Sequence, residues 1–281
     1  MECILLTDEQ RQHFSEEGYL IVRNALDAAT VEELQKTGDC LMGDFEFSGH
    51  YAHRRHGLVQ EEAFADLVTH SATVPLVIQL LGLNIHITNT ALIYKHPQQE
   101  PDTERNWHRD VGIQLDIGHA GMPLVGLKLG YCLTDFSESG SGMTLVVPKS
   151  HRLQEPLGIP AAALDPSSYE EMHLSPGDAF LFENRLYHAP GFNYSGQLAK
   201  QIIYGYHYRW IKPDYYLRYL NGRVQPDGPL LARLDDPGRQ LLGATVDSQG
   251  RQGADGIHWA LEEWAEKHKL HIVIFPRVVE I

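Results

Sequence analysis

The stretch LVGLKLGYCLT, residues 124–134, alternates between two kinds of side chain along its whole length. One set of alternate positions is entirely apolar and comprises Val125, Leu127, Leu129, Tyr131 and Leu133. The other set places Lys128 between Gly126 and Gly130. Because successive side chains of a β-strand point to opposite faces of the sheet, the pattern predicts a strand with two different faces. Its apolar face should pack against helices, and its second face should look into the interior of a rolled sheet.

Further strands are expected on both sides of this one. The β-rich stretches are residues 85–95, 143–147, 173–182 and 198–210. A Pro-Gly turn at Pro176-Gly177 introduces the second half of the third stretch. Many short strands separated by Gly and Pro turns favour a sandwich or a barrel. The expected fold class is therefore mainly β with flanking helices.

Helices are expected before and after the β-rich region. Thr7-Asp8-Glu9-Gln10 and Thr30-Val31-Glu32-Glu33 each have the form of a capping box at a helix N-terminus. Residues 61–82 look helical with a break at Pro75, because proline cannot continue a helix from its interior. The polar, basic stretch HYAHRRHG, residues 50–57, reads as a loop. Near the C-terminus, residues 257–268 resemble an amphipathic helix and residues 271–275 a late strand.

No linker divides the chain, so residues 1–281 are expected to form one domain. Its parts are N-terminal helices at 7–82, a β core at 85–212 and a C-terminal region at 213–281. The last region contains a Pro- and Gly-rich stretch, residues 222–253. We interpret it as a long insertion or lid, because the remainder after it lacks a clear core pattern.

The composition argues against several classes of partner. The formal net charge is −14 and the 23 Lys and Arg residues form no extended cluster, which disfavours nucleic acid and anionic membrane surfaces. The 3 cysteines are widely spaced, so no disulfide framework is expected and a cytoplasmic location fits. The first apolar stretch is too short for a signal peptide, and no segment approaches the ~18 apolar residues of a membrane span. A small-molecule substrate is compatible with all of this, and the oligomeric state is open.

The motif His108-Arg109-Asp110, together with the distant His188, has the composition of a metal site. Two histidines and one carboxylate form the facial triad that holds non-haem Fe(II) and leaves the opposite face of the ion open. Residues two apart in an extended segment point the same way, so His108 and Asp110 can reach one ion. Taken alone, the motif favours an ordinary loop histidine beside a surface aspartate, because the chain has 16 histidines. The strand-like segments around both parts favour the metal site.

Several ordered phrases of the chain resemble the phytanoyl-CoA dioxygenase-like family of Fe(II)/2-oxoglutarate-dependent oxygenases. They cover about residues 6–212 and comprise LTDEQ and EGYLIV within 6–22, WHRD at 107–110, LTD, GSG and VPKSHR within 133–152, and PGDA, His188 and NYS within 176–195. The resemblance implies a double-stranded β-helix (a jelly roll, cupin-like), bound Fe(II), 2-oxoglutarate as co-substrate and O₂. It also implies oxidation of an unactivated C–H bond, most often hydroxylation.

The resemblance also implies roles for individual residues. It assigns the metal to His108, Asp110 and His188. The carboxylate of Asp110 favours hydroxylation over halogenation, since halogenases of this class carry a small residue there. The family usually has an arginine eleven residues after the distal histidine, which grips the far carboxylate of 2-oxoglutarate. In this chain that position is Ala199, and a methyl group cannot replace the paired hydrogen bonds of a guanidinium.

Lys128 is the preferred substitute for the missing arginine, because a lysine that faces an apolar interior needs an anionic partner. A half-exposed strand with a solvated Lys128 is the alternative. Arg209 is the second candidate, since it shares parity with Ala199, Gln201 and His207, although a structural ion pair would explain it as well. Asn89 shares a face with Ile87 and Ala91 and is a candidate for the near carboxylate of the co-substrate, or a strand asparagine bonded to backbone.

Other polar residues are expected to be structural. The charge run at residues 53–56 reads as a solvated face, with contact to an anionic substrate as the alternative. His151 belongs to a phrase that looks structural, and Tyr204, Tyr206 and Tyr208 should pack the outer side of the sheet.

The sequence therefore predicts an Fe(II)/2-oxoglutarate-dependent dioxygenase that hydroxylates or otherwise oxidises a small molecule, with secondary metabolites among the candidates. Two other functions stay open. Ala199 is compatible with a catalytically silent metal-binding jelly roll, in which the clamp on the co-substrate has been lost. The metal ligands alone are compatible with a cupin-like oxygenase or isomerase that does not use 2-oxoglutarate.

Overall fold

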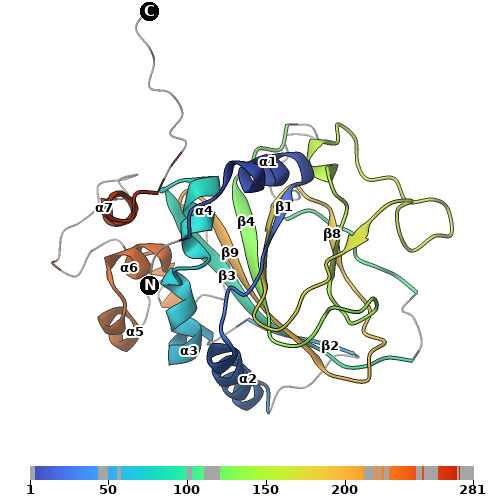
Figure 1. Ribbon diagram of the computed structural model, residues 1–281, viewed down its shortest axis with the longest axis horizontal. Coiled ribbons are helices and arrows are strands. Elements are labelled where there is room, and N and C mark those ends of the chain that lie inside the picture. Colours follow the sequence, from blue (N-terminus) through green and yellow to red (C-terminus); the bar gives the residue numbers. More distant parts are fainter. Residues whose placement is uncertain are drawn as a thin grey trace, which may run out of the picture.

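Two antiparallel sheets lie opposite each other at the centre of the molecule (Figure 1). The computed structural model describes residues 4–43, 50–55, 58–99, 103–110, 121–211, 219–220, 223–224, 228–244, 249, 259–270 and 272. The larger sheet has six strands in the spatial order β1 (Tyr19–Val22), β7 (Ala179–Glu183), β4 (Gly126–Cys132), β9 (Ala199–Tyr208), β3 (Ile85–Lys95) and β2 (Tyr51–Arg54). The smaller sheet has the order β6 (Glu170–Glu171), β5 (Thr144–Val146) and β8 (His188–Pro190). A separate hairpin pairs β10 (Tyr219–Leu220) with β11 (Arg223–Val224).

The expected mainly-β fold with flanking helices is confirmed, as a double-stranded β-helix whose sheets do not close into a barrel. Strand β4 has the two faces that its sequence predicts. Leu127, Leu129 and Tyr131 join the core that lies between the large sheet and the helices, and the Tyr131 hydroxyl lies 2.6 Å from Thr73 Oγ1. Lys128 lines a cavity between the sheets, while Cys132 joins a second core cluster there. A Cβ added at Gly130 would overlap the buried ring of Phe180, so glycine makes room for that ring rather than for Lys128.

Helices cover the outer face of the large sheet (Figure 1). They are α1 (Asp8–Glu17), α2 (Ala28–Met42), η1 (Leu58–Gln60), α3 (Glu62–Ala65), η2 (Asp66–Thr69) and α4 (Val74–Leu81). The capping box at Thr7 and Gln10 is confirmed. The predicted cap at Thr30 is wrong, because α2 begins earlier and Asp27 accepts a hydrogen bond from the Thr30 amide at 2.8 Å.

Pro75 starts a helix rather than breaking one. It occupies the first turn of α4, where its missing N–H has no partner to lose. The break in the predicted helix falls between η2 and α4 instead. Among the described residues no single helix is long and apolar enough to cross a membrane, and only the bent pair Glu62–Thr69 with Val74–Leu81 meets that criterion jointly.

The C-terminal helices lie on the same side of the large sheet as α4. They are α5 (Gly228–Arg233), α6 (Asp236–Leu241) and α7 (Trp259–Lys267). Helix α7 confirms the helix predicted at residues 257–268. Buried Leu241, Leu242 and Leu261 join the core on the outer face of the large sheet. The described helices α5, α6 and α7 therefore pack on the helical side of the large sheet. The predicted strand at 271–275 lies outside the described residues.

Two features of β2, the edge strand of the large sheet, and of its neighbour β3 differ from expectation. Residues 51–54 are not a loop but form β2, which pairs with β3 and places His53 opposite Ile93. In β3 itself, a bulge between Ile87 and Asn89 shifts the register against β9. Ile87 consequently packs against the helices, whereas Asn89 faces the cavity with Ala91. The expectation that Ile87 and Asn89 share a face is wrong, because a bulge adds one residue and reverses the alternation.

Candidate metal centre

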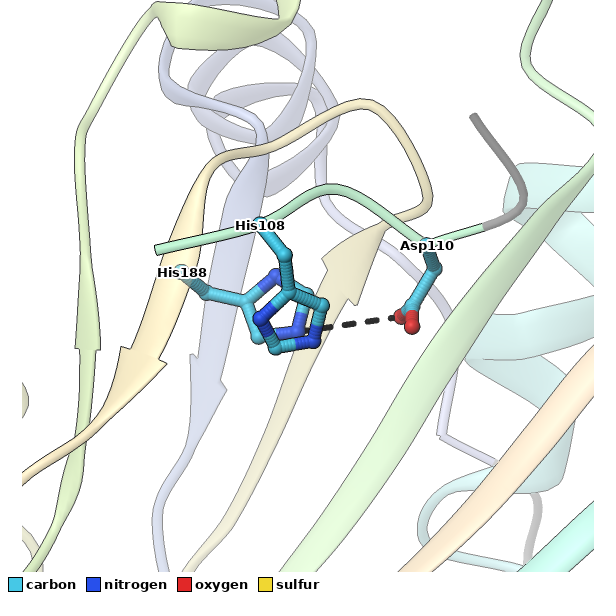
Figure 2. A group of neighbouring side chains, drawn as sticks. All are labelled: His108, Asp110 and His188. Carbon is cyan, nitrogen blue, oxygen red and sulfur yellow. Dashed lines mark ion pairs between the residues drawn. The ribbon is translucent and has the colours of Figure 1, made fainter. Parts of the chain in front are cut away.

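His108, Asp110 and His188 lie together at the wall of the cavity between the two sheets (Figure 2). Each offers one ligand atom, and these atoms all lie within 4.8 Å of one another. The two imidazole rings lie 4.2 Å apart between centroids, and His188 Nε2 is 3.9 Å from Asp110 Oδ2. The structure thus brings the three predicted ligands to one point.

A short backbone bridge produces this convergence. The amides of His108 and His188 each donate to the other residue's carbonyl oxygen at 3.0 Å, so the H-x-D segment adds to the end of β8. Arg109 lies between the two ligands and donates to the Arg185 carbonyl oxygen at 2.7 Å. Alternation along the segment leaves His108 and Asp110 on one side (Figure 2).

Hydrogen bonds prepare both histidines as ligands. Nδ1 of His108 lies 2.9 Å from the Asn106 carbonyl oxygen, and Nδ1 of His188 lies 3.0 Å from the Leu186 carbonyl oxygen. Because a carbonyl can only accept, each Nδ1 carries a proton, so Nε2 is the ring atom through which each histidine can bind a metal. Burial lowers the pKa of His188 to about 4, against an opposing effect of Asp110, so this imidazole is neutral at pH 7.

Asp110 completes a donor set that suits Fe(II). Burial acts to raise its pKa, but electrostatic attraction, chiefly to the Lys128 ammonium, outweighs burial and keeps the pKa below its usual range. The carboxylate is therefore ionised, and its buried Oδ2 has no hydrogen-bond partner among the described residues. An unsatisfied carboxylate oxygen beside two imidazole lone pairs fits a divalent ion, and two histidines with one carboxylate are typical of non-haem Fe(II).

Asp165 anchors the segment that carries His108 and Asp110. It pairs with Arg105 at 2.6 Å and accepts from Trp107 Nε1 at 2.9 Å. The Arg105 guanidinium also lies 3.9 Å above the centre of the Phe192 ring, which follows β8. Trp107 packs against Tyr169 and is not among the residues that line the cavity. The aspartate thus holds the ligand segment without touching the metal site.

We expect Asp165→Ala to weaken metal binding by about 10- to 100-fold, the usual cost of losing a group that orients a ligand. Titration of the protein with Co(II) by calorimetry measures this. Asp135→Ala is a suitable control, because Asp135 is exposed and its carboxylate accepts a hydrogen bond from the Ser137 amide, away from the metal ligands. An unchanged Co(II) affinity in a folded Asp165→Ala protein would show that Asp165 does not position the ligands.

The cavity beside the metal ligands has a volume of about 670 Å³, a size typical of small-molecule sites. Its lining includes the inward face of β3, namely Asn89, Ala91, Ile93 and Lys95, and Gln201 and Ile203 of β9. Lys128 reaches it from β4, donates to Asn89 Oδ1 at 3.2 Å and lies 3.8 Å from Asp110 Oδ2. Lys128 and Asn89 therefore form one cluster with the metal ligands.

Arg209 is the predicted site residue that the structure does not bring into this cluster. Strand β9 ends at Tyr208, and the chain turns there. The Arg209 amide donates to the Asn84 carbonyl oxygen at 3.0 Å, and its charge acts on His86. Arg209 is not among the residues that line the cavity. The parity that links it to Ala199 and Gln201 fails because it lies beyond the strand.

The basic residues of the cavity wall include His53 and Arg55, for which the sequence favours a solvated face over contact with a substrate, and Lys95, which it does not single out. The sequence favours a solvated face at His53 and Arg55 because β2 and the residue after it are polar and read as a loop. Burial lowers the pKa of His53 to about 3, and the charges of Arg55 and Lys128 act in the same direction. Lys95 shares the parity of Asn89 and Ala91, and this signal was present in the sequence.

Residues that the sequence sets aside as structural do have structural contacts. His151 Nε2 lies 3.1 Å from the Ser15 carbonyl oxygen, under α1. Tyr204 and Tyr206 are buried against the helices, and the Tyr204 hydroxyl donates to the Phe64 carbonyl oxygen at 2.7 Å. Lys200 points outward and pairs with Asp39 of α2 at 2.6 Å.

Comparisons with known proteins agree with this geometry. The family model for Phytanoyl-CoA dioxygenase (PhyH) matches residues 14–201. A search of curated proteins finds no match. Among solved structures, the epimerase SnoN in complex with Fe3+, alpha ketoglutarate and nogalamycin RO is 20% identical, with a TM-score of 0.60 over 78% of this chain and 91% of that chain.

Two further structures have the same fold. HygX from Streptomyces hygroscopicus with nickel and 2-oxoglutarate bound is 16% identical, with a TM-score of 0.60 over 80% of this chain and 98% of that one. The carbocyclase SnoK from nogalamycin biosynthesis, described as non-heme and alpha ketoglutarate dependent, is 19% identical, with a TM-score of 0.56 over 72% and 84%. At these identities the likeness establishes the fold alone.

Proposed function

The chain belongs to the phytanoyl-CoA dioxygenase family, and on that premise we propose that it is a non-haem Fe(II)- and 2-oxoglutarate-dependent oxygenase. The observation that carries the proposal is the group His108, Asp110 and His188, whose ligand atoms lie within 4.8 Å of one another at the wall of a cavity. The three residues would hold Fe(II). With 2-oxoglutarate and O₂, Fe(II) supplies the oxidising chemistry that attacks a C–H bond.

The residues of this chain have separate tasks around that ion. The two histidines have their Nδ1 atoms bonded to backbone carbonyls, which leaves Nε2 to bind the ion, and Asp110 presents an ionised oxygen. Lys128 stands 3.8 Å from Asp110 and donates to Asn89, so these two side chains would contact the near carboxylate of a co-substrate held at the metal. Ile93, Ile203 and Phe182 form an apolar part of the wall, which excludes water from the reacting atoms.

We propose hydroxylation or a related oxidation of a small molecule as the reaction. Asp110 occupies the third ligand position, so no site is freed for a halide. The cavity volume of about 670 Å³ suits a compact metabolite. One structural neighbour is a complex with nogalamycin RO, which makes secondary metabolites a reasonable first set to screen.

A spectroscopic titration tests the proposal without knowledge of the substrate. Under anaerobic conditions, Fe(II) followed by 2-oxoglutarate should produce a weak visible charge-transfer band. Admission of O₂ should then release succinate. A flat spectrum with iron fully loaded would exclude 2-oxoglutarate as co-substrate and favour a triad oxygenase that works without it. A band that persists under O₂ without release of succinate would favour a catalytically silent protein.

A further inference from the structure

Lys95 is a buried lysine on the wall of the same cavity. It is 5% exposed, and its ammonium donates to the carbonyl oxygen of Gly142 and, at 3.4 Å, to that of Gly191. Among the described residues no carboxylate forms an ion pair with it. Burying a cation with only neutral partners is costly, so an anionic ligand in the cavity would satisfy this group.

The sheet register places Lys95 at the position where the arginine of the family is missing. Lys95 pairs directly with Ala199 across β3 and β9, and opposite residues of an antiparallel pair share a face. A Cβ added at Gly142 would contact both the Ala199 methyl and the Lys95 Cδ, so the two side chains meet at one place. The lysine therefore occupies the space beside Ala199 from the neighbouring strand.

Lys95 also lies at a suitable distance from the metal ligands along the cavity. Its acceptor Gly191 follows His188 by three residues, which is about 10 Å of extended chain. Lys128, in contrast, pairs with Gly205, which lies six residues or about 20 Å along β9 from Ala199. Lys128 is 3.8 Å from Asp110 and therefore belongs to the metal end of the cavity.

A five-carbon dicarboxylate that is chelated to the metal at one end requires a cation further along the cavity for its other end. We propose that Lys95 holds the distal carboxylate of 2-oxoglutarate, in place of the arginine that Ala199 replaces. The inference rests on the proposed function. Arg105 is less suited, because Asp165 already neutralises its guanidinium. Arg55 lines the cavity directly after β2, in contact with His53, and its substitution serves as a comparison.

The charge state of Lys95 supports this assignment. Burial lowers its pKa to about 7, while Glu171 acts to raise the pKa and Arg105 to lower it. The Tyr51 ring centre lies 5.9 Å from Nζ. Above pH 7 the unliganded lysine is mostly neutral, and a bound carboxylate favours its ammonium form. Binding should therefore take up a proton, and affinity should fall by up to about tenfold per pH unit above pH 7.

A ligand comparison separates the two lysines. Calorimetry on Co(II)-loaded protein would measure the binding of 2-oxoglutarate and of 2-oxopentanoate, which has no distal carboxylate. We expect Lys95→Met to weaken 2-oxoglutarate by at least about tenfold and to leave 2-oxopentanoate and Co(II) binding unchanged. Lys128→Met should weaken both ligands equally, and Arg55→Met should not change their ratio.

A double substitution that moves the positive charge from position 95 to position 199 tests whether 2-oxoglutarate binding can be restored. Adding Ala199→Arg to Lys95→Ala should restore much of the affinity for 2-oxoglutarate, because a guanidinium from position 199 enters the space that the lysine leaves. If Lys95→Met keeps the wild-type ratio of the two affinities, the assignment of Lys95 is wrong while the proposed function stands. If the wild-type protein binds neither ligand, both are wrong.

The wild-type protein alone offers a second test, which decides the matter if the Lys95 variants do not fold. Between pH 7 and pH 9, affinity for 2-oxoglutarate should fall while affinity for 2-oxopentanoate stays level. Calorimetry in two buffers of different ionisation enthalpy should show proton uptake with the dicarboxylate only. Parallel pH profiles for the two ligands would overturn the assignment.

Discussion

His188→Ala lowers metal affinity by more than about 100-fold, the upper cost of losing a residue that merely orients a ligand. The reason is that His188 contributes one of only three donor atoms, and its Nε2 faces Asp110 at 3.9 Å. Water can replace the imidazole at the ion, but it lacks the fixed position that the Leu186 carbonyl gives to the ring. Co(II) calorimetry measures the loss, and the anaerobic Fe(II)/2-oxoglutarate band should disappear with it.

His151→Ala is the matched control for this variant. His151 and His188 are both 7% exposed, and each has a ring nitrogen bonded to a backbone carbonyl. His151 packs under α1, outside the cavity lining. Its removal should lower the free energy of unfolding and leave the Co(II) affinity unchanged. Equal metal affinities in the two variants would exclude His188 as a ligand.

Local chemistry made much of this fold predictable. The alternation in residues 124–134 determined both faces of β4, because one face is wholly apolar and the other carries a lysine. The H-x-D motif brought His108 and Asp110 to the same side for the same reason of alternation. The position of His188 beside them depends on the bridge between His108 and the end of β8. That contact joins residues 80 positions apart, and the sequence of neither segment predicts it.

The errors have equally local causes. The bulge after Ile87 reverses the parity of β3, and no Gly or Pro marks it in the sequence. Strand β2 is four residues long and polar, and its pairing with β3 supplies the order that its composition lacks. The bulge moved Ile87 to the helical face, and the pairing of β2 placed His53 on the cavity wall. Lys95 became a candidate for the co-substrate only when the register set it opposite Ala199.

The second large effect is expected from substitution of Gly191, which follows β8 of the small sheet and lines the cavity. A Cβ at this position would overlap the Met143 carbonyl oxygen, which is backbone and cannot turn aside. The Gly191 amide also donates to that oxygen at 2.8 Å, next to the pairing of Thr144 with Pro190. We expect Gly191→Ala to lower the free energy of unfolding by about 3 kcal/mol or more, at the upper end for overpacking.

The same change should disturb the metal site, since His188 lies three residues before Gly191 on the strand that must move. Urea denaturation would measure the loss of stability, and Co(II) calorimetry on the remaining folded protein would measure the ligand geometry. Gly196→Ala is the control, because a Cβ at Gly196 meets nothing within 4 Å and should change stability by less than about 0.5 kcal/mol. If Gly191→Ala matches Gly196→Ala in both measurements, β5 and β8 are not packed as closely as the structure has them. The Gly191 carbonyl oxygen, which accepts from Lys95 and lies three residues after His188, would then not be fixed by packing against β5.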